Sequence, residues 1–212
     1  MLTPTPLPRS FYNRPTLQVA RDLLGKKLVH TKDKQHTSGI ITETEAYCGE
    51  EDLGCHAKAG RTARTEILYG SAGYAYVYFT YGMHWLFNCV TRPQGTPEAV
   101  LVRAIEPTDG IAIIAQRRGH QPQHLWTDGP AKLTQALGIS GNQNGIDLTS
   151  QDSEIFLEDA LDVTDGRVTA SPRVGLYSVP EPWKSIAWRF QADLTGMLKV
   201  NNVSIGGTYE PA

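Results

Sequence analysis

Apolar and polar residues alternate with a changing period along the chain and divide it into short elements. From Pro15 to Leu24 apolar residues recur at helical spacing, with Leu17 and Ala20 on one face, and Gly25 follows as a C-terminal cap. Elsewhere the period is two, and β-branched or aromatic residues predominate, which is typical of strands. The predicted strands cover residues 27–30, 39–47, 74–80, 84–91, 99–105, 155–157 and 167–176.

Helices occur singly among these strands. The pattern predicts helices at 107–118 and 130–137, and 183–190 is irregular or briefly helical. Residues 49–73 lack sustained periodicity, so they form a long loop of the kind that is usually functional in a compact domain. Without a repeated strand-helix-strand rhythm, the sequence predicts an α+β fold rather than a doubly wound parallel sheet.

The 212 residues are expected to form a single domain. Its core is expected to be a curved mixed or antiparallel β-sheet with flanking helices. A β-hairpin, with its turn at residues 81–83, is expected to protrude from it. We expect a short flexible segment at residues 1–6 and a C-terminal tail from about residue 206 to 212.

Composition is that of an ordinary soluble protein, with 40% hydrophobic and 20% charged residues and no apolar run that could span a membrane. Residues 1–7 lack the basic start and apolar stretch of a secretion signal. The protein is therefore expected inside the cell and not secreted.

The three cysteines form no paired framework and are expected to be free thiols. Cys48, Cys55 and His56 fall short of a zinc site, which usually needs four ligands at tighter spacing. The net charge of −2 lacks the basic excess of many nucleic-acid-binding domains. A low net charge does not exclude nucleic-acid binding, because phosphate contacts depend on local basic clusters.

Two carboxylates stand beside an aromatic ring in the second predicted strand. Glu43, Glu45 and Tyr47 alternate, so in an extended segment they share one face at a spacing of roughly 6 to 7 Å. Burial or a like-charged neighbour raises the pKa of one carboxylate and makes it a better proton acceptor near neutral pH. Glu and Thr alternating on a solvated sheet face is the other interpretation of this segment.

Tyrosines are concentrated in the predicted hairpin. Tyr74, Tyr76 and Tyr78 share one strand face, where they either stack a planar ligand or pack across strands. Tyr81 stands on the Gly-containing turn, where a bulky ring has little core to fill and is able to wedge into a DNA duplex. Arg103 alternates with apolar neighbours, so its guanidinium points to the core side and needs a partner such as Glu43 or Glu45.

Together these segments resemble the alkyladenine (3-methyladenine) DNA glycosylase family. The resemblance covers nearly the whole chain, from residue 7 to about residue 190. It is carried by residues 41–47 (ITETEAY), His56, 76–83 (YVYFTYGM), Asn88, 101–107 (LVRAIEP), 128–133 (DGPAKL) and 172–176 (PRVGL).

The resemblance implies a role for each matching residue. Glu45 would be the general base, supported by Glu43, and Arg103 would steady the water and Glu45. The flipped base would lie among Tyr47, His56 and Tyr78, with Asn88 disfavouring guanine-type amino groups. The DNA-contacting residues would be Tyr81 in the gap of the duplex, Met83 and His84 beside it, and Arg61 and Arg64 at the backbone.

The activity that the resemblance implies is that of a monofunctional DNA glycosylase acting as a monomer. Such an enzyme would work in the cytoplasm with the nucleoid if the protein is bacterial, and in the nucleus if it is eukaryotic. It would flip alkylated or deaminated purines out of double-stranded DNA and hydrolyse the N-glycosidic bond, with no lyase step and no metal or organic cofactor. Two alternatives stay open. One is a module that recognises damaged DNA without cutting it. The other is an inverting glycoside hydrolase, although neighbouring carboxylates on one strand suit that reaction poorly.

Overall fold

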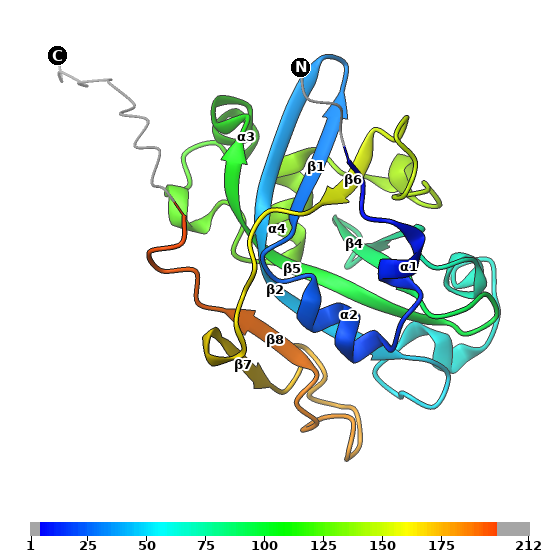
Figure 1. The fold of residues 1–212 in the computed structure, drawn as a ribbon. Helices are drawn as coiled ribbons and strands as arrows, with labels where there is room; N and C mark the ends of the chain where they lie inside the picture. The colour runs from blue at the N-terminus through cyan, green and yellow to red at the C-terminus, as the bar shows by residue number, and fades with distance from the viewer. Residues whose placement is uncertain (1–4, 199–212) are drawn as a thin grey trace, which may run out of the picture.

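One branched antiparallel sheet organises the described part of the chain, residues 5–198 of the computed structural model (Figure 1). The sheet has 8 strands in the order β3-β4-β5-β2-β1-β6, and β8 joins β2 and β7 off this path. The strands are β1 (Lys27–Lys32), β2 (Gln35–Cys48), β3 (Ala75–Thr80), β4 (His84–Thr91), β5 (Glu98–Asp109), β6 (Ile155–Glu158), β7 (Val168–Ser171) and β8 (Arg189–Ala192).

Short helices fill the connections. They are α1 (Arg9–Tyr12), α2 (Thr16–Asp22), α3 (Ile111–Arg118), α4 (Pro130–Leu137) and the 3-10 helices η1 (His56–Ala59), η2 (Glu66–Tyr69), η3 (Gln123–Leu125), η4 (Gly141–Gln143) and η5 (Asp165–Arg167). The α+β prediction is confirmed. Within the described residues every strand pair is antiparallel, so the mixed sheet that the sequence also allowed does not form.

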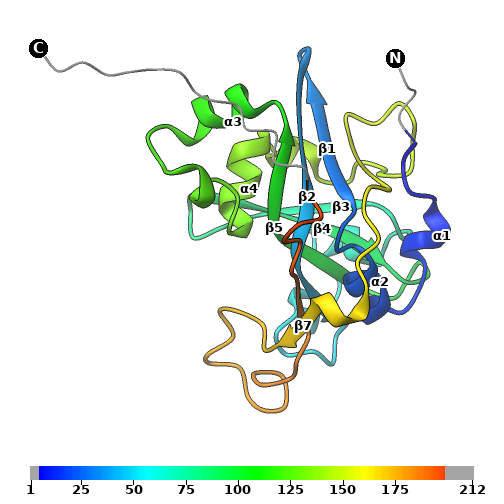
Figure 2. The same cartoon turned by 60° about the vertical axis from the view of Figure 1, so that its left-hand side comes forward.

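The sheet branches at β2, the long blue strand of Figure 2. One edge of β2 pairs with β5 along most of its length. On the other edge residues 35–40 pair with β1, and residues 43–45 pair with β8. The register with β5 shifts on both sides of Glu43, which leaves Thr42 and Arg103 without an opposite residue. The carboxylate segment therefore lies where the sheet divides.

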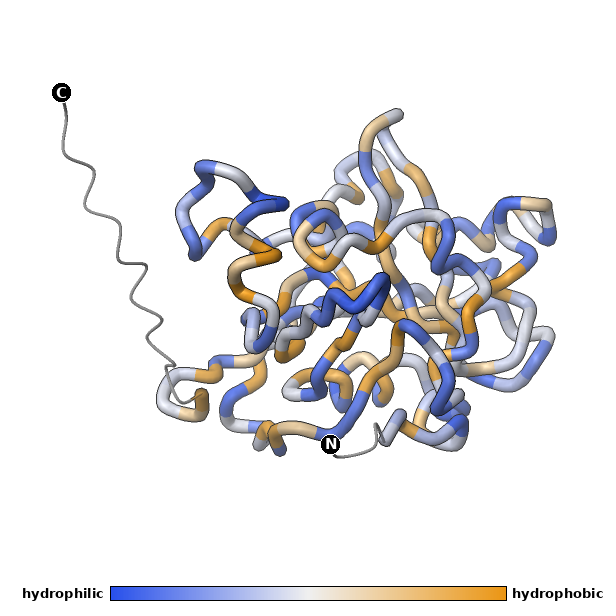
Figure 3. The backbone as a smooth tube through the Cα atoms, turned by 90° about the horizontal axis from the view of Figure 1, so that it is seen from above, coloured by the Kyte–Doolittle hydropathy of each residue, from blue (hydrophilic) through white to orange (hydrophobic). Residues whose placement is uncertain are grey.

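The two faces of the sheet have different coverings. Val100 and Val102 of β5 enter the main core with residues of α2, α3 and α4, such as Leu133. Leu101 and Arg103, which alternate with them, face the opposite side, where they line a cavity. The backbone tube in Figure 3 shows apolar segments through the interior and hydrophilic ones in the outer loops.

The predicted helices differ in detail from those observed. The helix expected from residue 107 begins at Ile111, because β5 stays paired with β2 up to Asp109 and Gly110 turns the chain at a φ of 71°. In α2 the predicted inward residue Leu17 is 38% exposed. Ala20, also predicted to face inward, is buried, together with Thr16 and Val19.

The C-terminal strands are shorter and later than predicted. Of the strand expected at 167–176, only β7 forms, and Pro172 follows it directly because proline donates no ladder hydrogen bond. Residues 189–192, at the end of the stretch interpreted as irregular, form β8 on β2. Residues 1–4 of the predicted flexible segment and the predicted tail at 206–212 lie outside the described residues. Pro6, within that segment, bridges to Glu158.

Candidate active site

A cavity of about 350 Å³ opens on the sheet face opposite the main core. Its floor comes from β2, β3, β4 and β5, and its walls from the loop at 49–73 and the segment at 174–176. The lining residues are Tyr47, Gly54, Cys55, His56, Leu68, Tyr76, Tyr78, Thr80, Tyr81, Leu86, Asn88, Ala99, Leu101, Arg103, Pro130, Val174, Gly175 and Leu176. The long loop predicted to be functional thus forms one side of the cavity.

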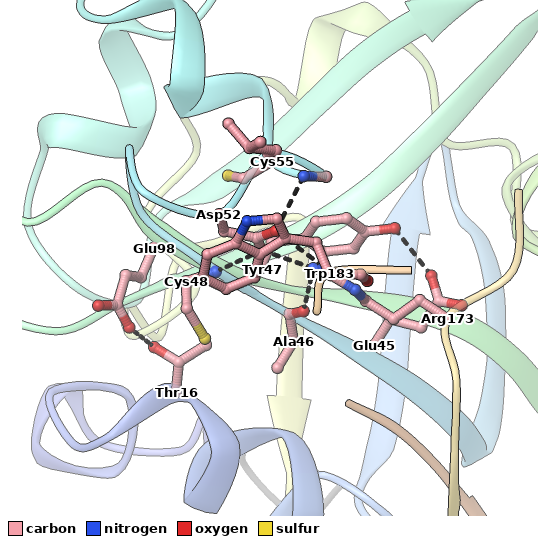
Figure 4. A network of polar contacts seen from close by, with 12 residues as sticks. Thr16, Glu45, Ala46, Tyr47, Cys48, Asp52, Cys55, Glu98, Arg173 and Trp183 are labelled. Atoms are coloured by element: carbon pink, nitrogen blue, oxygen red, sulfur yellow. Dashed lines mark hydrogen bonds and ion pairs between the residues drawn. The ribbon is translucent and has the colours of Figure 1, made fainter. Parts of the chain in front are cut away.

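Glu45 lies behind this lining with no exposed surface. The Tyr47 hydroxyl donates to its Oε2 at 2.9 Å, and the Val174 backbone N–H donates to its Oε1 at 2.6 Å. Arg103 Nη1 lies 3.3 Å from Oε2. Burial raises the pKa of Glu45, and Arg103 and the Val174 hydrogen bond partly oppose this rise. All three partners line the cavity, and Figure 4 shows the Tyr47 contact.

Arg103 joins the two predicted carboxylates. Its Nε donates to Glu43 Oε1 at 2.7 Å while its Nη1 faces Glu45, and its side chain is 13% exposed. Glu43 also faces β8, where Arg189 Nη1 lies 3.5 Å from Oε1. Sequence reasoning placed Arg103 near these carboxylates, and the structure confirms it. It missed Arg189, because β8 was not predicted.

Aromatic rings surround the cavity. The His56 ring meets Tyr78 edge to face, with centroids 4.5 Å apart, and its Nδ1 lies 3.0 Å from the Tyr76 hydroxyl. Burial lowers the pKa of His56 to about 4, so the ring is neutral at physiological pH. Tyr47 completes the predicted trio. Tyr76 lines the cavity too, whereas Tyr74 precedes β3 and packs under Arg9 instead.

Asn88 is buried in β4 opposite Tyr76 on β3 and Leu101 on β5. Its amide nitrogen donates to the Tyr76 carbonyl at 3.0 Å. This bond fixes the orientation of the side chain, which reaches the cavity between two strands. The antiparallel register therefore places Asn88 among the aromatic residues, as predicted.

The hairpin turn carries the most exposed apolar side chains of the predicted set. Tyr81 is 84% and Met83 67% exposed, and His84 beside them is exposed as well. Tyr81 also reaches the cavity lining. Of the two loop arginines, Arg64 lies near the cavity, with its guanidinium carbon 5.4 Å from the centroid of the Tyr78 ring. Arg61 is held in a two-bond ion pair with Glu66, at 2.8 and 2.6 Å.

A buried ion pair that sequence reasoning missed supports the site. Arg173 and Asp52 have fully buried side chains and are joined by bonds of 2.5 and 2.8 Å. Arg173 also donates to the Ala46 carbonyl at 2.9 Å and lies over the Tyr47 ring at 4.7 Å (Figure 4). Arg173 belongs to the motif at residues 172–176, but no local sequence pattern indicates that it contacts Asp52.

The three cysteines, Cys48, Cys55 and Cys89, are unpaired thiols. Burial raises the pKa of Cys55, in the cavity wall, to about 11. Within residues 5–198, no group of three or more His, Cys, Asp or Glu side chains is arranged to hold a metal ion. In the same part of the chain, none of the helices has the length and apolar character needed to cross a membrane.

Comparison with known proteins establishes the class. The family model for methylpurine-DNA glycosylase (MPG) matches residues 10–194. The chain therefore belongs to the methylpurine-DNA glycosylase family and is a DNA repair enzyme that hydrolyses N-glycosyl bonds. This confirms the family that the sequence motifs indicated.

Relatives are similar over most of their length, and each is named as an inferred 3-methyladenine DNA glycosylase. That of Desulfitobacterium hafniense is 45% identical over 193 residues, covering 87% of this chain and 93% of the relative. That of Clostridium acetobutylicum is 45% identical over 192 residues, covering 86% and 91%. That of Methanocella arvoryzae is 44% identical over 183 residues, covering 84% and 90%.

Proposed function

We propose that this glycosylase flips an alkylated or deaminated purine out of duplex DNA into the cavity and hydrolyses its glycosidic bond with a water activated by Glu45. One observation carries the proposal. Glu45 is fully buried and has a raised pKa, yet three groups that line an aromatic cavity, Tyr47, Arg103 and the Val174 N–H, hold it in place. A carboxylate in such surroundings is suited to general-base catalysis.

The cavity suits an extruded base in size and lining. Its volume of about 350 Å³ is that of a small-molecule site. Tyr47, His56 and Tyr78 offer ring surfaces for stacking, and a cationic alkylated purine gains cation–π attraction from the tyrosines. Extrusion costs a few kcal/mol and costs least for a weakly paired lesion, so poor pairing is a first filter.

In the chemical step water attacks the sugar carbon, its proton passes to Glu45, and the base leaves with the electrons of the glycosidic bond. Arg103 keeps Glu45 ionised against the pKa rise that burial causes, and Glu43 balances the charge of Arg103. Alkylation at N3 or N7 makes the purine a good leaving group. No lysine lines the cavity in the described part of the chain, which supports direct hydrolysis without a Schiff base or strand cleavage.

The other predicted residues select and hold the substrate. Asn88 lies in the cavity lining, where it would disfavour the amino group of guanine. Tyr81 would fill the gap left by the extruded nucleotide, with Met83 and His84 beside it. Arg61 and Arg64 would contact the DNA backbone, and Arg61 would first have to leave Glu66. We propose that the enzyme acts as a monomer in the compartment that holds the DNA.

The test is base release from a duplex that carries one hypoxanthine or ethenoadenine, measured as alkali-labile abasic sites. The wild-type protein is expected to release the base, and Glu45→Gln is expected to lose about 100-fold or more in rate. Equal activity of the two proteins would refute the role of Glu45. Binding of the lesion by wild type without base release would favour a passive recognition module.

A further inference from the structure

Exposed apolar side chains are concentrated around the mouth of the cavity. In the described part of the chain, the exposed large hydrophobic residues other than Leu17 on α2 lie in or near the segments that line the cavity. Leu53, Phe79, Tyr81, Val174 and Tyr177 either line it or adjoin a lining residue, and Met83 lies two residues after Tyr81. Clustered exposed apolar side chains of this kind mark an interaction site. The hairpin accounts for only part of the cluster.

Tyr177 holds the same position in its turn as Tyr81 does, although only Tyr81 has a left-handed backbone, with a φ of 51°. Tyr81 follows the cavity residue Thr80 in a four-residue turn closed by the hydrogen bond from the Met83 N–H to the Thr80 carbonyl, 3.2 Å. Tyr177 follows the cavity residue Leu176 in a turn closed by the bond from the Val179 N–H to the Leu176 carbonyl, 3.1 Å. Both rings stand at the first central position of a turn at the cavity edge.

Tyr177 contributes little to folding, because 79% of its surface stays exposed. The loop at 172–188 that carries it extends away from the sheet, as the orange segment of Figure 2 shows. Its two ends are nevertheless fixed. Arg173 is held by Asp52 at the start, and at the end the Trp188 carbonyl accepts a hydrogen bond of 2.9 Å from the Ala46 N–H of β2. An aromatic side chain on an anchored loop loses little conformational freedom on binding.

We propose that Tyr177 is a second contact with duplex DNA, which packs against the nucleotides flanking the extruded one and supports the opened duplex together with Tyr81. The inference rests on the proposed function. If the cavity receives the base, the duplex must lie across its mouth, so the rim residues touch the nucleotides on either side. Opening the stack exposes base faces, and an aromatic ring covers such a face.

The experiment compares Tyr177→Ala with wild type, with Tyr177→Phe as the conservative variant and Leu17→Ala as a matched exposed apolar control away from the cavity. We expect Tyr177→Ala to bind a duplex with one ethenoadenine about tenfold more weakly. Fluorescence of 2-aminopurine placed beside the lesion should change less with this variant. Tyr177→Phe and Leu17→Ala should match wild type, and the melting temperature should stay unchanged in all three.

Affinity for a single-stranded oligonucleotide with the same lesion separates the duplex contact from a general effect. Tyr177→Ala should bind this strand as wild type does, because no duplex has to be held open. Wild-type affinity of Tyr177→Ala for the duplex would overturn the proposal, and so would an equal loss on the single strand. If the wild type binds lesion duplexes but releases no base, the proposed function fails, while the Tyr177 result is still read from binding.

Discussion

The Val174 backbone N–H donates to Glu45 Oε1 at 2.6 Å across a sequence separation of 129 residues. A backbone donor cannot be removed by most substitutions, and this one is held in place by the ion pair of the preceding residue, Arg173, with Asp52. The orientation of the buried Glu45 carboxylate therefore depends on Arg173 and Val174, which lie outside the strands of the sheet. Several measurable properties follow from these contacts.

The rate of base release should depend on the ionisation of Glu45. The general base must be deprotonated, so single-turnover excision should rise with pH, with a midpoint above the 4.5 of an unperturbed glutamate because burial raises its pKa. A cationic alkylated purine is the substrate to use, since its departure needs no acid. Tyr47→Phe removes a hydrogen bond that lowers the pKa of Glu45, so its midpoint should be higher still. A midpoint at or below 4.5 in wild type would contradict this.

Arg103 should be needed for stability as well as for activity. Arg103→Met leaves Glu43 and Glu45 without their shared cation in a nearly buried site, which is expected to cost about 3 to 5 kcal/mol of unfolding free energy. Urea denaturation measures this cost. The control is Lys132→Met, which breaks an exposed pair with Asp128 and should cost no more than about 1 kcal/mol. Equal effects would show that Arg103 is not an essential counter-charge.

The pair of Asp52 and Arg173 should behave as a coupled unit. Asp52→Leu or Arg173→Met alone leaves a buried charge unpaired and should destabilise the protein by about 3 to 5 kcal/mol. The double variant Asp52→Leu with Arg173→Met removes both charges, so its loss should be smaller than either single loss. A double-mutant cycle by urea denaturation measures the coupling. Additive losses would mean that the two side chains act independently.

Tyr81→Ala should weaken binding and flipping without harming the fold. The ring is 84% exposed, so its removal should change the unfolding free energy by less than about 0.5 kcal/mol. Affinity for a lesion-containing duplex should fall because the gap in the base stack is no longer filled. Thermal denaturation and fluorescence anisotropy provide the two measurements. Severe unfolding would instead identify Tyr81 as a residue of the core.

His56 should remain neutral well below physiological pH. Its pKa is lowered to about 4 by burial, with smaller effects from Arg64 and Lys58. NMR titration of the ring should show this midpoint, and Arg64→Gln should raise it towards 6.5. Because the folded pKa lies below the unfolded value, His56 contributes stability that is present above pH 6.5 and is lost as the pH falls towards about 4. A wild-type midpoint near 6.5 would contradict the burial argument.

Local sequence patterns were sufficient where a side chain's position follows from strand periodicity. Tyr76 and Tyr78 alternate on β3 and both line the cavity, and the pairing of β3 with β4 places Asn88 opposite Tyr76. The same patterns misjudged element ends. The helix expected at residue 107 begins at Ile111, because pairing with β2 outweighs local helix preference as far as Asp109.

The sequence by itself determined the α+β class, the hairpin with Tyr81 at its turn, and the placement of Glu43 and Glu45 on one face of a strand. Each of these depends on neighbours only a few residues apart. Tertiary structure alone decided that Val174 would hold Glu45 and that Arg173 would meet Asp52, 121 residues away. The physical reason is that a buried hydrogen bond or ion pair forms only when distant segments are packed together, and such packing leaves no periodic signal in either segment.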